Sequence, residues 1–227
     1  EDPSGMWNAE AEGASENEAD PQESGLYYTV KVTAPDGTQV SANGSPEQLV
    51  IEDPQLWWPN TYGDPPIYTA SLTATVGGKV SDSRSFTFGV RKFTYDTEKP
   101  MTIYCNGTRI VCRGGNWGMD DSNLAATPED YDIKVRMHAE ANLTMIRNWV
   151  GMTNHRAFYD ACDKYGILIW NDFWLANPID REQGSPDEDC NPDDNEMFLA
   201  NAVDNVYRIR RHAALAVYCG RNEGPPP

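Results

Sequence analysis

The fold follows from the stretch Ala214-Leu-Ala-Val-Tyr-Cys-Gly-Arg-Asn-Glu-Gly-Pro-Pro-Pro227. It begins with an apolar run that has the length of one β-strand, and Asn222 and Glu223 come soon after that run. Near-continuous apolar strands are typical of parallel sheets that helices cover on both faces. The carboxyl ends of such strands carry the catalytic groups of α/β barrels. We therefore expect Asn222 and Glu223 at the functional edge of a parallel sheet.

The preceding residues repeat this strand-and-helix pattern. Apolar runs predict three earlier strands, over residues 109–117, 143–147 and 167–170. Helices are predicted from Thr127 to about Ala141, from about His155 to Tyr165 and from about Asn195 to Arg211. Thr127, Pro128 and Asp130 are typical of a helix start, and Gly166 is typical of a C-cap. This α/β order predicts that residues 97–227 form the first four βα units of a (β/α)8 TIM barrel.

Residues 25–96 have the pattern of an all-β unit. Apolar and polar residues alternate over Leu26–Val32 and Ile67–Val76, and turns are predicted at Pro35-Asp-Gly37 and Gly77-Gly78. Short antiparallel strands at this spacing predict an immunoglobulin-like β-sandwich, or the later strands of one. Between them lies Leu56-Trp-Trp-Pro-Asn60. This segment is either a platform on which a sugar stacks or, as we favour, a packing plug between the two domains.

Acidic residues dominate the charge of the chain. There are 35 Asp and Glu residues against 18 Lys and Arg residues, which gives a formal net charge of −17. We therefore expect neither nucleic acid nor an anionic membrane as a partner, because both attract basic residues. Residues 1–24 contain no Lys or Arg and few apolar residues. This composition predicts a mobile acidic segment or a long insertion loop.

The sequence predicts no metal site and no cofactor. The five cysteines form no CxxC pair and have no metal-ligand spacing with the three histidines, so we expect structural thiols. The acidic loop Asp187–Asp194 could hold a cation, but we favour solvated surface charge there. No apolar run approaches the roughly 20 residues of a membrane span.

Polar and aromatic side chains are predicted at all four strand ends, at Asn116-Trp117, Arg147-Asn148-Trp149, Asn171-Asp172 and Asn222-Glu223. Amides and carboxylates pair with hydroxyl groups and Trp rings cover the apolar face of a sugar, so this set predicts a carbohydrate site. Glu223 is the candidate acid/base of a retaining glycosidase, and Asp172 is either its partner or a substrate contact. We expect Trp117, Arg147, Trp149, Asn171 and Asn222 to contact the substrate. Packing roles for Trp117 and Trp149 remain an alternative, and the sequence contains no convincing nucleophile.

Several short motifs follow one another in a characteristic order. They are Leu56-Trp-Trp-Pro-Asn60, Phe88-Gly-Val-Arg-Lys92, Arg113-Gly-Gly-Asn-Trp117, Asn142-Leu-Thr-Met-Ile-Arg-Asn-Trp149, Phe158-Tyr-Asp-Ala-Cys-Asp-Lys-Tyr-Gly166, Ile169-Trp-Asn-Asp-Phe173, Arg211-His212 and Cys219-Gly-Arg-Asn-Glu-Gly224. In this order they resemble glycoside hydrolase family 2, in particular its β-mannosidase, endo-β-mannosidase and exo-β-glucosaminidase branch. In that family a jelly-roll domain and an immunoglobulin-like domain precede the barrel, so the chain resembles the middle of such an enzyme.

The resemblance implies roles for the residues at the strand ends. Glu223 would be the acid/base on strand four, and Asn222 would hydrogen-bond the 2-hydroxyl group of the sugar. Arg147 would orient the nucleophile, while Trp149 and Asp172 would line the pocket for the glycone, the sugar on the nonreducing side of the cleaved bond.

The expected activity is therefore retaining hydrolysis of β-mannosides or related β-glycosides, without a cofactor. The family's nucleophile is a Glu on strand seven, beyond Pro227, so the chain alone is expected to be inactive without the remainder of its barrel. Val150-Gly-Met152 departs from the Gly-rich turn common in mannosidases, which puts the glycone in question. The alternatives are a β-galactosidase or β-glucuronidase activity of the same family, and a non-catalytic carbohydrate-binding or interaction module. A periplasmic or secreted location is favoured over a cytoplasmic one.

Overall fold

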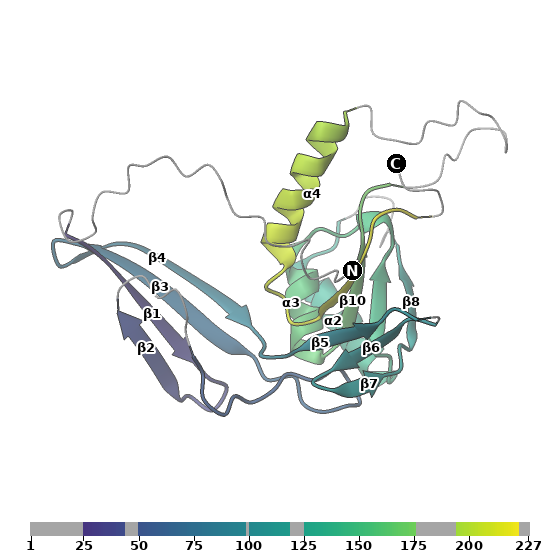
Figure 1. The fold of residues 1–227 in the computed structure, drawn as a ribbon, viewed down its shortest axis with the longest axis horizontal. Helices are drawn as coiled ribbons and strands as arrows, with labels where there is room; N and C mark the ends of the chain where they lie inside the picture. The colour runs from purple at the N-terminus through teal and green to yellow at the C-terminus, as the bar shows by residue number, and fades with distance from the viewer. Residues whose placement is uncertain (1–24, 44–49, 99, 119–124, 176–193, 223–227) are drawn as a thin grey trace.

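The computed structural model describes residues 25–43, 50–98, 100–118, 125–175 and 194–222 (Figure 1). These residues form three sheets, two of them four-stranded and one three-stranded. The predicted acidic segment 1–24, the acidic loop Asp187–Asp194 except for its last residue, and Glu223 lie outside the described residues. Within the described part, no helix has the length and apolar sequence that crossing a membrane requires.

The first sheet is antiparallel and has the strand order β2-β1-β3-β4. Its strands are β1 (Leu26–Thr33), β2 (Gln39–Asn43), β3 (Tyr68–Val76) and β4 (Lys79–Phe88). Positive φ angles at Gly77 and Gly78 turn β3 into β4, as predicted. The described residues from Leu26 to Phe88 form this one sheet, so the immunoglobulin-like sandwich remains a prediction.

The second sheet is small and connects the two predicted domains. Its strands β5 (Phe93–Asp96), β6 (Thr102–Cys105) and β7 (Thr108–Ile110) are antiparallel. Because β5 pairs with β6, this sheet crosses the boundary that we expected at residue 96. Arg91 and Tyr95 join the region to the parallel sheet: Arg91 Nε donates to the Ala213 carbonyl at 3.0 Å and its Nη2 to the Leu215 carbonyl at 3.3 Å, and Tyr95 Oη donates to the Ala216 carbonyl at 2.7 Å.

The single strand predicted over residues 109–117 is in fact two strands in different sheets. Here β7 ends at Ile110, and β8 (Gly114–Trp117) starts the parallel sheet. The side chain of Thr144 holds the bend between them. Its hydroxyl donates to the Val111 carbonyl at 2.9 Å and accepts a hydrogen bond from the Arg113 amide at 2.8 Å. Gly114 then passes so close to Met145 that a Cβ atom there would lie 1.7 Å from the Met145 carbonyl oxygen.

The third sheet is parallel and has the order β11-β10-β9-β8. After β8 it consists of β9 (Met145–Asn148), β10 (Leu168–Asp172) and β11 (Leu215–Cys219), and the helices α2 (Pro128–Glu140), α3 (Arg156–Tyr165) and α4 (Asn195–Ile209) connect the strands. Figure 1 shows α2 and α3 beside these strands and α4 above α3. Four consecutive parallel strands agree with the predicted βα units, whereas their closure into a barrel remains a prediction.

The helix boundaries confirm the capping signals. The Thr127 hydroxyl accepts from the Asp130 amide at 3.3 Å, and the Asp130 carboxylate accepts from the Thr127 amide at 2.8 Å, which completes a capping box. At the end of α3, Gly166 adopts φ 71°, in the left-handed region. The helix limits that we predicted differ from the observed ones by no more than two residues.

The segment Leu56-Trp-Trp-Pro-Asn60 packs between the sheets. Trp57 is fully buried, and its Nε1 donates to the Asp163 carbonyl of α3 at 2.8 Å. The Asn60 amide group donates to the carbonyls of Ala139 and Leu143 at 2.9 and 2.8 Å. The Asn60 backbone amide also donates to the Gly166 carbonyl at 2.7 Å. These contacts support the packing plug over the sugar platform.

We predict that Gly166→Ala destabilises the protein by about 3 kcal/mol, because it adds both backbone strain and a steric contact. A Cβ atom at Gly166 would lie 2.8 Å from the Asn60 backbone nitrogen. Gly37→Ala is the matched control, since Gly37 also has a positive φ, 85°, but no atom within 4 Å of the added Cβ. It should cost only about 1 kcal/mol. Urea denaturation measures both values, and equal losses would contradict the close contact.

Candidate active site

Arg147 links the ends of three neighbouring parallel strands. It lies on β9, and its Nε and Nη2 donate to the two carboxylate oxygens of Asp172 on β10, at 3.1 and 2.7 Å. The same Nη2 donates to Oδ1 of Asn222, which follows β11, at 2.8 Å. A two-point contact between guanidinium and carboxylate fixes the orientation of both groups. We call Arg147, Asp172 and Asn222 the Arg147 cluster.

Asp172 is the structural anchor of this cluster. Its side chain is 0% exposed, whereas that of Arg147 is 24% exposed. A buried carboxylate is unfavourable unless it is paired and hydrogen-bonded. Here the two bonds from Arg147 are joined by a third from the Val150 amide, 3.1 Å from Oδ2. Its carboxylate therefore faces protein groups among the described residues, and the expected place of Asp172 in the glycone pocket stays a prediction.

The turn after β9 brings the Val150 amide to Asp172. The 3₁₀ turn η2 (Trp149–Gly151) contains Val150 at φ 45° and ψ 31°, and Gly151 at φ 60°. A Cβ atom at Gly151 would lie 2.9 Å from the Asp172 carbonyl oxygen, so the close packing of this turn requires glycine. Trp149 is half-buried at the start of the turn, two residues after Arg147.

Trp117 does not join the cluster. The register places Asn116 opposite Arg147 and Trp117 opposite Asn148, and successive residues of a strand point to opposite faces. Trp117 is 8% exposed, its Nε1 donates to the Thr153 hydroxyl at 3.2 Å, and its ring lies 5.3 Å from that of Phe158 on α3. The side chain therefore packs toward the helices, in line with the packing role that the sequence left open, and a substrate contact stays a prediction.

Asn171 faces the helices in the same way. It is 3% exposed, and its Oδ1 accepts hydrogen bonds from the Tyr159 hydroxyl and the Asn148 side-chain amide, both at 2.9 Å. Its Nδ2 donates to the Asp172 carbonyl at 3.2 Å. All these partners are protein groups. Asn171 thus supports the strand ends, and its expected contact with a substrate stays a prediction.

The opposite face of the sheet carries Asn116, Arg147 and Trp170, which stand side by side in register. The Arg147 guanidinium lies 5.4 Å from the centre of the Trp170 ring. These residues line a hollow of about 310 Å³ that also contacts Met145 and Cys112. Sequence reasoning missed Trp170, although it lies two residues before Asp172 on the same strand and so faces the same side of the sheet.

Asn222 is held at the edge of the same site. It is 5% exposed, and its backbone amide donates to the Leu175 carbonyl at 3.0 Å. One residue after β10 ends, the Phe173 amide donates to the Cys219 carbonyl at 2.9 Å. The chain is therefore fixed up to the residue before Glu223.

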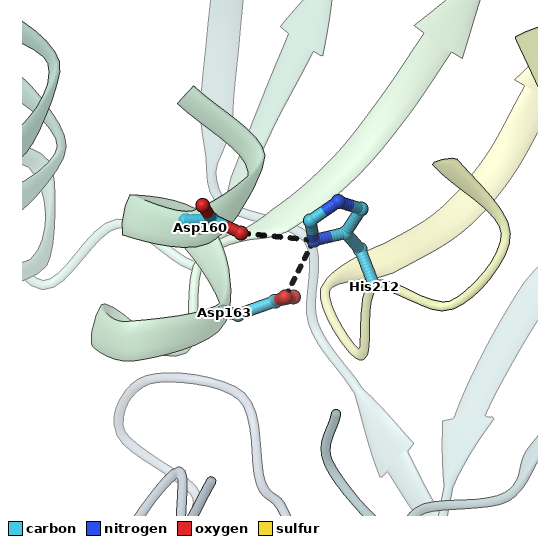
Figure 2. A group of neighbouring side chains, drawn as sticks. All are labelled: Asp160, Asp163 and His212. Atoms are coloured by element: carbon cyan, nitrogen blue, oxygen red, sulfur yellow. Dashed lines mark hydrogen bonds and ion pairs between the residues drawn. The ribbon is translucent and has the colours of Figure 1, made fainter. Parts of the chain in front are cut away.

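One further group, Asp160, Asp163 and His212, has donor atoms within 4.8 Å of one another (Figure 2). His212 Nδ1 donates to Asp163 Oδ2 at 2.6 Å, and the Ala214 amide donates to Asp163 Oδ1 at 2.8 Å. Asp160 lies near Arg156, at 3.2 Å, and Arg211, at 3.8 Å. Because protein donors already occupy both oxygens of Asp163, we assign this group to the attachment of α3 to the start of β11, not to a metal.

We predict that Asp172→Asn destabilises the protein by about 3 kcal/mol, because it leaves Arg147 without its buried counter-charge. Asp132→Asn is the matched control, since it breaks an ion pair with Lys164 whose side chains are 39% and 58% exposed. An exposed pair of this kind contributes less than about 1 kcal/mol. Thermal denaturation of both variants tests the difference, and a loss at Asp172 no larger than at Asp132 would refute the anchoring role.

Comparisons with known proteins agree with the family that the motifs indicated. Residues 9–91 match the family model described as Glycosyl hydrolases family 2. A mannosylglycoprotein endo-β-mannosidase of Lilium longiflorum is 37% identical over 185 residues, which are 79% of this chain and 19% of the relative. A β-mannosidase B of Thermothelomyces thermophilus is 33% identical over 184 residues, 77% of this chain and 21% of the relative.

The fold is also similar to that of solved structures. The crystal structure of a β-D-mannosidase from Dictyoglomus thermophilum has a TM-score of 0.70 at 25% identity, over 87% of this chain and 25% of that protein. The chain spans about a fifth of the length of the curated relatives that it matches. By its sequence, its motifs and its fold, the chain belongs to the glycosyl hydrolases of family 2.

Proposed function

We propose that this chain supplies the acid/base side of the active site of a retaining β-glycosidase, which hydrolyses β-mannosides or related β-glycosides. The observation that carries the proposal is the Arg147 cluster. It ties the ends of β9 and β10 to Asn222, the residue directly before Glu223. A carboxylic acid next to fixed polar groups at parallel strand ends is an arrangement suited to glycoside hydrolysis.

In the proposed mechanism Glu223 acts twice. In the first step its proton passes to the glycosidic oxygen as the bond to the anomeric carbon breaks, and a carboxylate nucleophile forms a covalent bond to that carbon. In the second step the Glu223 carboxylate removes a proton from water, whose oxygen attacks the anomeric carbon and releases the nucleophile. The two carboxyl groups of retaining enzymes stand about 5 Å apart.

The Arg147 cluster would prepare this reaction in two ways. The positive charge of Arg147 favours the ionised form of a carboxyl group placed near it, which is the form that a nucleophile needs. Asp172, which also accepts a hydrogen bond from the Val150 amide, holds the guanidinium in one orientation, so Asp172 is a positioning residue. Asn222 is bound through Oδ1 to Arg147 and is proposed to contact the 2-hydroxyl group of the sugar.

The domain arrangement belongs to the same proposal. We propose an acidic segment over residues 1–24, an immunoglobulin-like domain over 25–96 and the first half of a TIM barrel over 97–227. The β-mannosidase names of the relatives support a mannoside as substrate, and the chain's motifs lean the same way. Trp149, the first residue of the turn that holds Asp172, is proposed to line the glycone pocket.

We predict that Glu223→Gln in the full-length protein lowers kcat by about 10²- to 10⁴-fold, because the amide can neither give nor take the proton. The assay measures release of aryl leaving groups from β-mannoside, β-glucosaminide, β-galactoside and β-glucuronide. Glu196→Gln, on the exposed first turn of α4, is the matched control and should leave kcat within a factor of two or so of wild type.

The outcome separates the alternatives. Cleavage of the β-mannoside or β-glucosaminide that depends on Glu223 supports the proposal, whereas cleavage of only the galactoside or glucuronide assigns a different substrate. Folded full-length protein that cleaves none of the four glycosides, but binds sugar, would support a carbohydrate-binding module instead.

A separate expectation concerns the 227-residue chain alone. We predict no turnover of these glycosides by the purified chain, because the resemblance places the nucleophile on strand seven, beyond its last residue. Among the described residues at the strand ends, Asp172 carries a carboxylate, and both of its oxygens already accept hydrogen bonds from Arg147. Turnover by the purified chain that Glu223→Gln abolishes would contradict this expectation.

A further inference from the structure

A second hollow lies where α4 faces the segments that follow β9 and β10. It measures about 330 Å³, and none of its lining residues belongs to the Arg147 cluster. Asn154 lies beyond the end of β9, Trp174 follows β10, and the other residues come from one face of α4. Ligand pockets begin at about this volume.

One buried polar atom in this hollow has no hydrogen-bond partner among the described residues. Asn205 is 5% exposed, and its Nδ2 donates to Oδ1 of Asn154 at 3.0 Å. Its own Oδ1 is buried and accepts no hydrogen bond from any group in the described part of the chain. A buried amide oxygen without a donor is unfavourable by about 1–3 kcal/mol, so a ligand that donates a hydrogen bond there gains affinity.

The remaining lining combines an aromatic wall with further polar groups. The rings of Trp174 and Phe198 meet edge to face with their centres 6.3 Å apart, and Trp174 is 38% exposed. Asn201 and Asp204 line the hollow from exposed positions on α4. An indole face beside amide and carboxylate groups is suited to a ring that is apolar on one face and carries hydroxyl groups at its edge.

The charges of the hollow balance. Arg208 and Asp204 are its two charged lining residues, and Arg208 Nη1 already donates to the Asn154 carbonyl at 2.9 Å. A balanced pair attracts neither anions nor cations strongly, so a neutral ligand fits this site better than a phosphate or a carboxylate.

We propose that this hollow is a subsite for a neutral sugar unit of an oligosaccharide substrate. The proposal rests on the proposed glycosidase function and extends it: the protein acts on chains of at least two sugar units, and Asn205, Asn201 and Trp174 hold one of them. Asn205 Oδ1 accepts a hydrogen bond from a sugar hydroxyl, and the exposed part of the Trp174 ring covers the sugar's apolar face.

The test uses the full-length protein with two substrates, β-1,4-linked mannotriose and an aryl β-mannoside. Asn205→Ala and the milder Asn201→Ala should lower kcat/KM for mannotriose by about tenfold more than for the aryl mannoside, the effect of losing one hydrogen bond. Leu199→Ala is the matched control, because Leu199 lies on α4 outside the hollow and is 61% exposed. It should change the ratio of the two values by less than about twofold.

Direct binding separates this proposal from the proposed function. Saturation-transfer NMR with mannotriose should show binding to wild type and to Leu199→Ala, and weaker binding to Asn201→Ala. If no glycoside is cleaved but mannotriose binding still depends on Asn201, the subsite stands and the glycosidase proposal fails. If both substrates lose activity equally, or if mannotriose binding is unchanged in Asn201→Ala and Asn205→Ala, the subsite is refuted. Asn201→Ala keeps the test valid if Asn205→Ala does not fold.

Discussion

The alternation of side chains along the parallel strands is the constraint on which the site depends. Helices cover one face of the sheet, so every second residue of β8, β9 and β10 is used to attach them. Trp117, Asn148 and Asn171 serve this attachment, through Thr153, Phe158 and Tyr159. The intervening residues, Asn116, Arg147 and Trp170, lie on the opposite face of the sheet and are candidates for binding or catalysis. The register between strands thus separates polar residues that look alike in sequence. Some of them attach the helices, and the others are candidates for contact with a substrate.

The strand ends keep their positions because residues that precede the parallel sheet in sequence hydrogen-bond to its strands and helices. Trp57 and Asn60 bond to the carbonyls of α3 and to the chain before β9. Arg91 and Tyr95 bond to the carbonyls of Ala213 and Ala216, at the start of β11. The acceptors in these contacts are backbone carbonyls. The contacts therefore fix the position of each element and do not depend on its side chains. The β-rich region therefore helps to hold the elements that carry the candidate site.

Local signals in the sequence predicted most elements, and tertiary contacts explain the rest. The Thr127 capping box and the Gly166 C-cap depend on a few neighbouring residues and were predicted correctly. The bend between β7 and β8 depends on the hydroxyl of Thr144, about 30 residues away, which no local pattern reveals. The same limit applies to Trp117 and Asn171. Motif order located the strand ends, but only the register between strands decides which face each residue occupies.

The left-handed backbone of Val150 has a consequence for how the site responds to substrate. A β-branched residue at φ 45° is strained by about 1–2 kcal/mol, and folding must supply that energy through the bond from its amide to Asp172. The dipole of this amide is therefore oriented before any sugar arrives. In the proposed reaction this turn therefore need not reorganise, because folding has already oriented the amide.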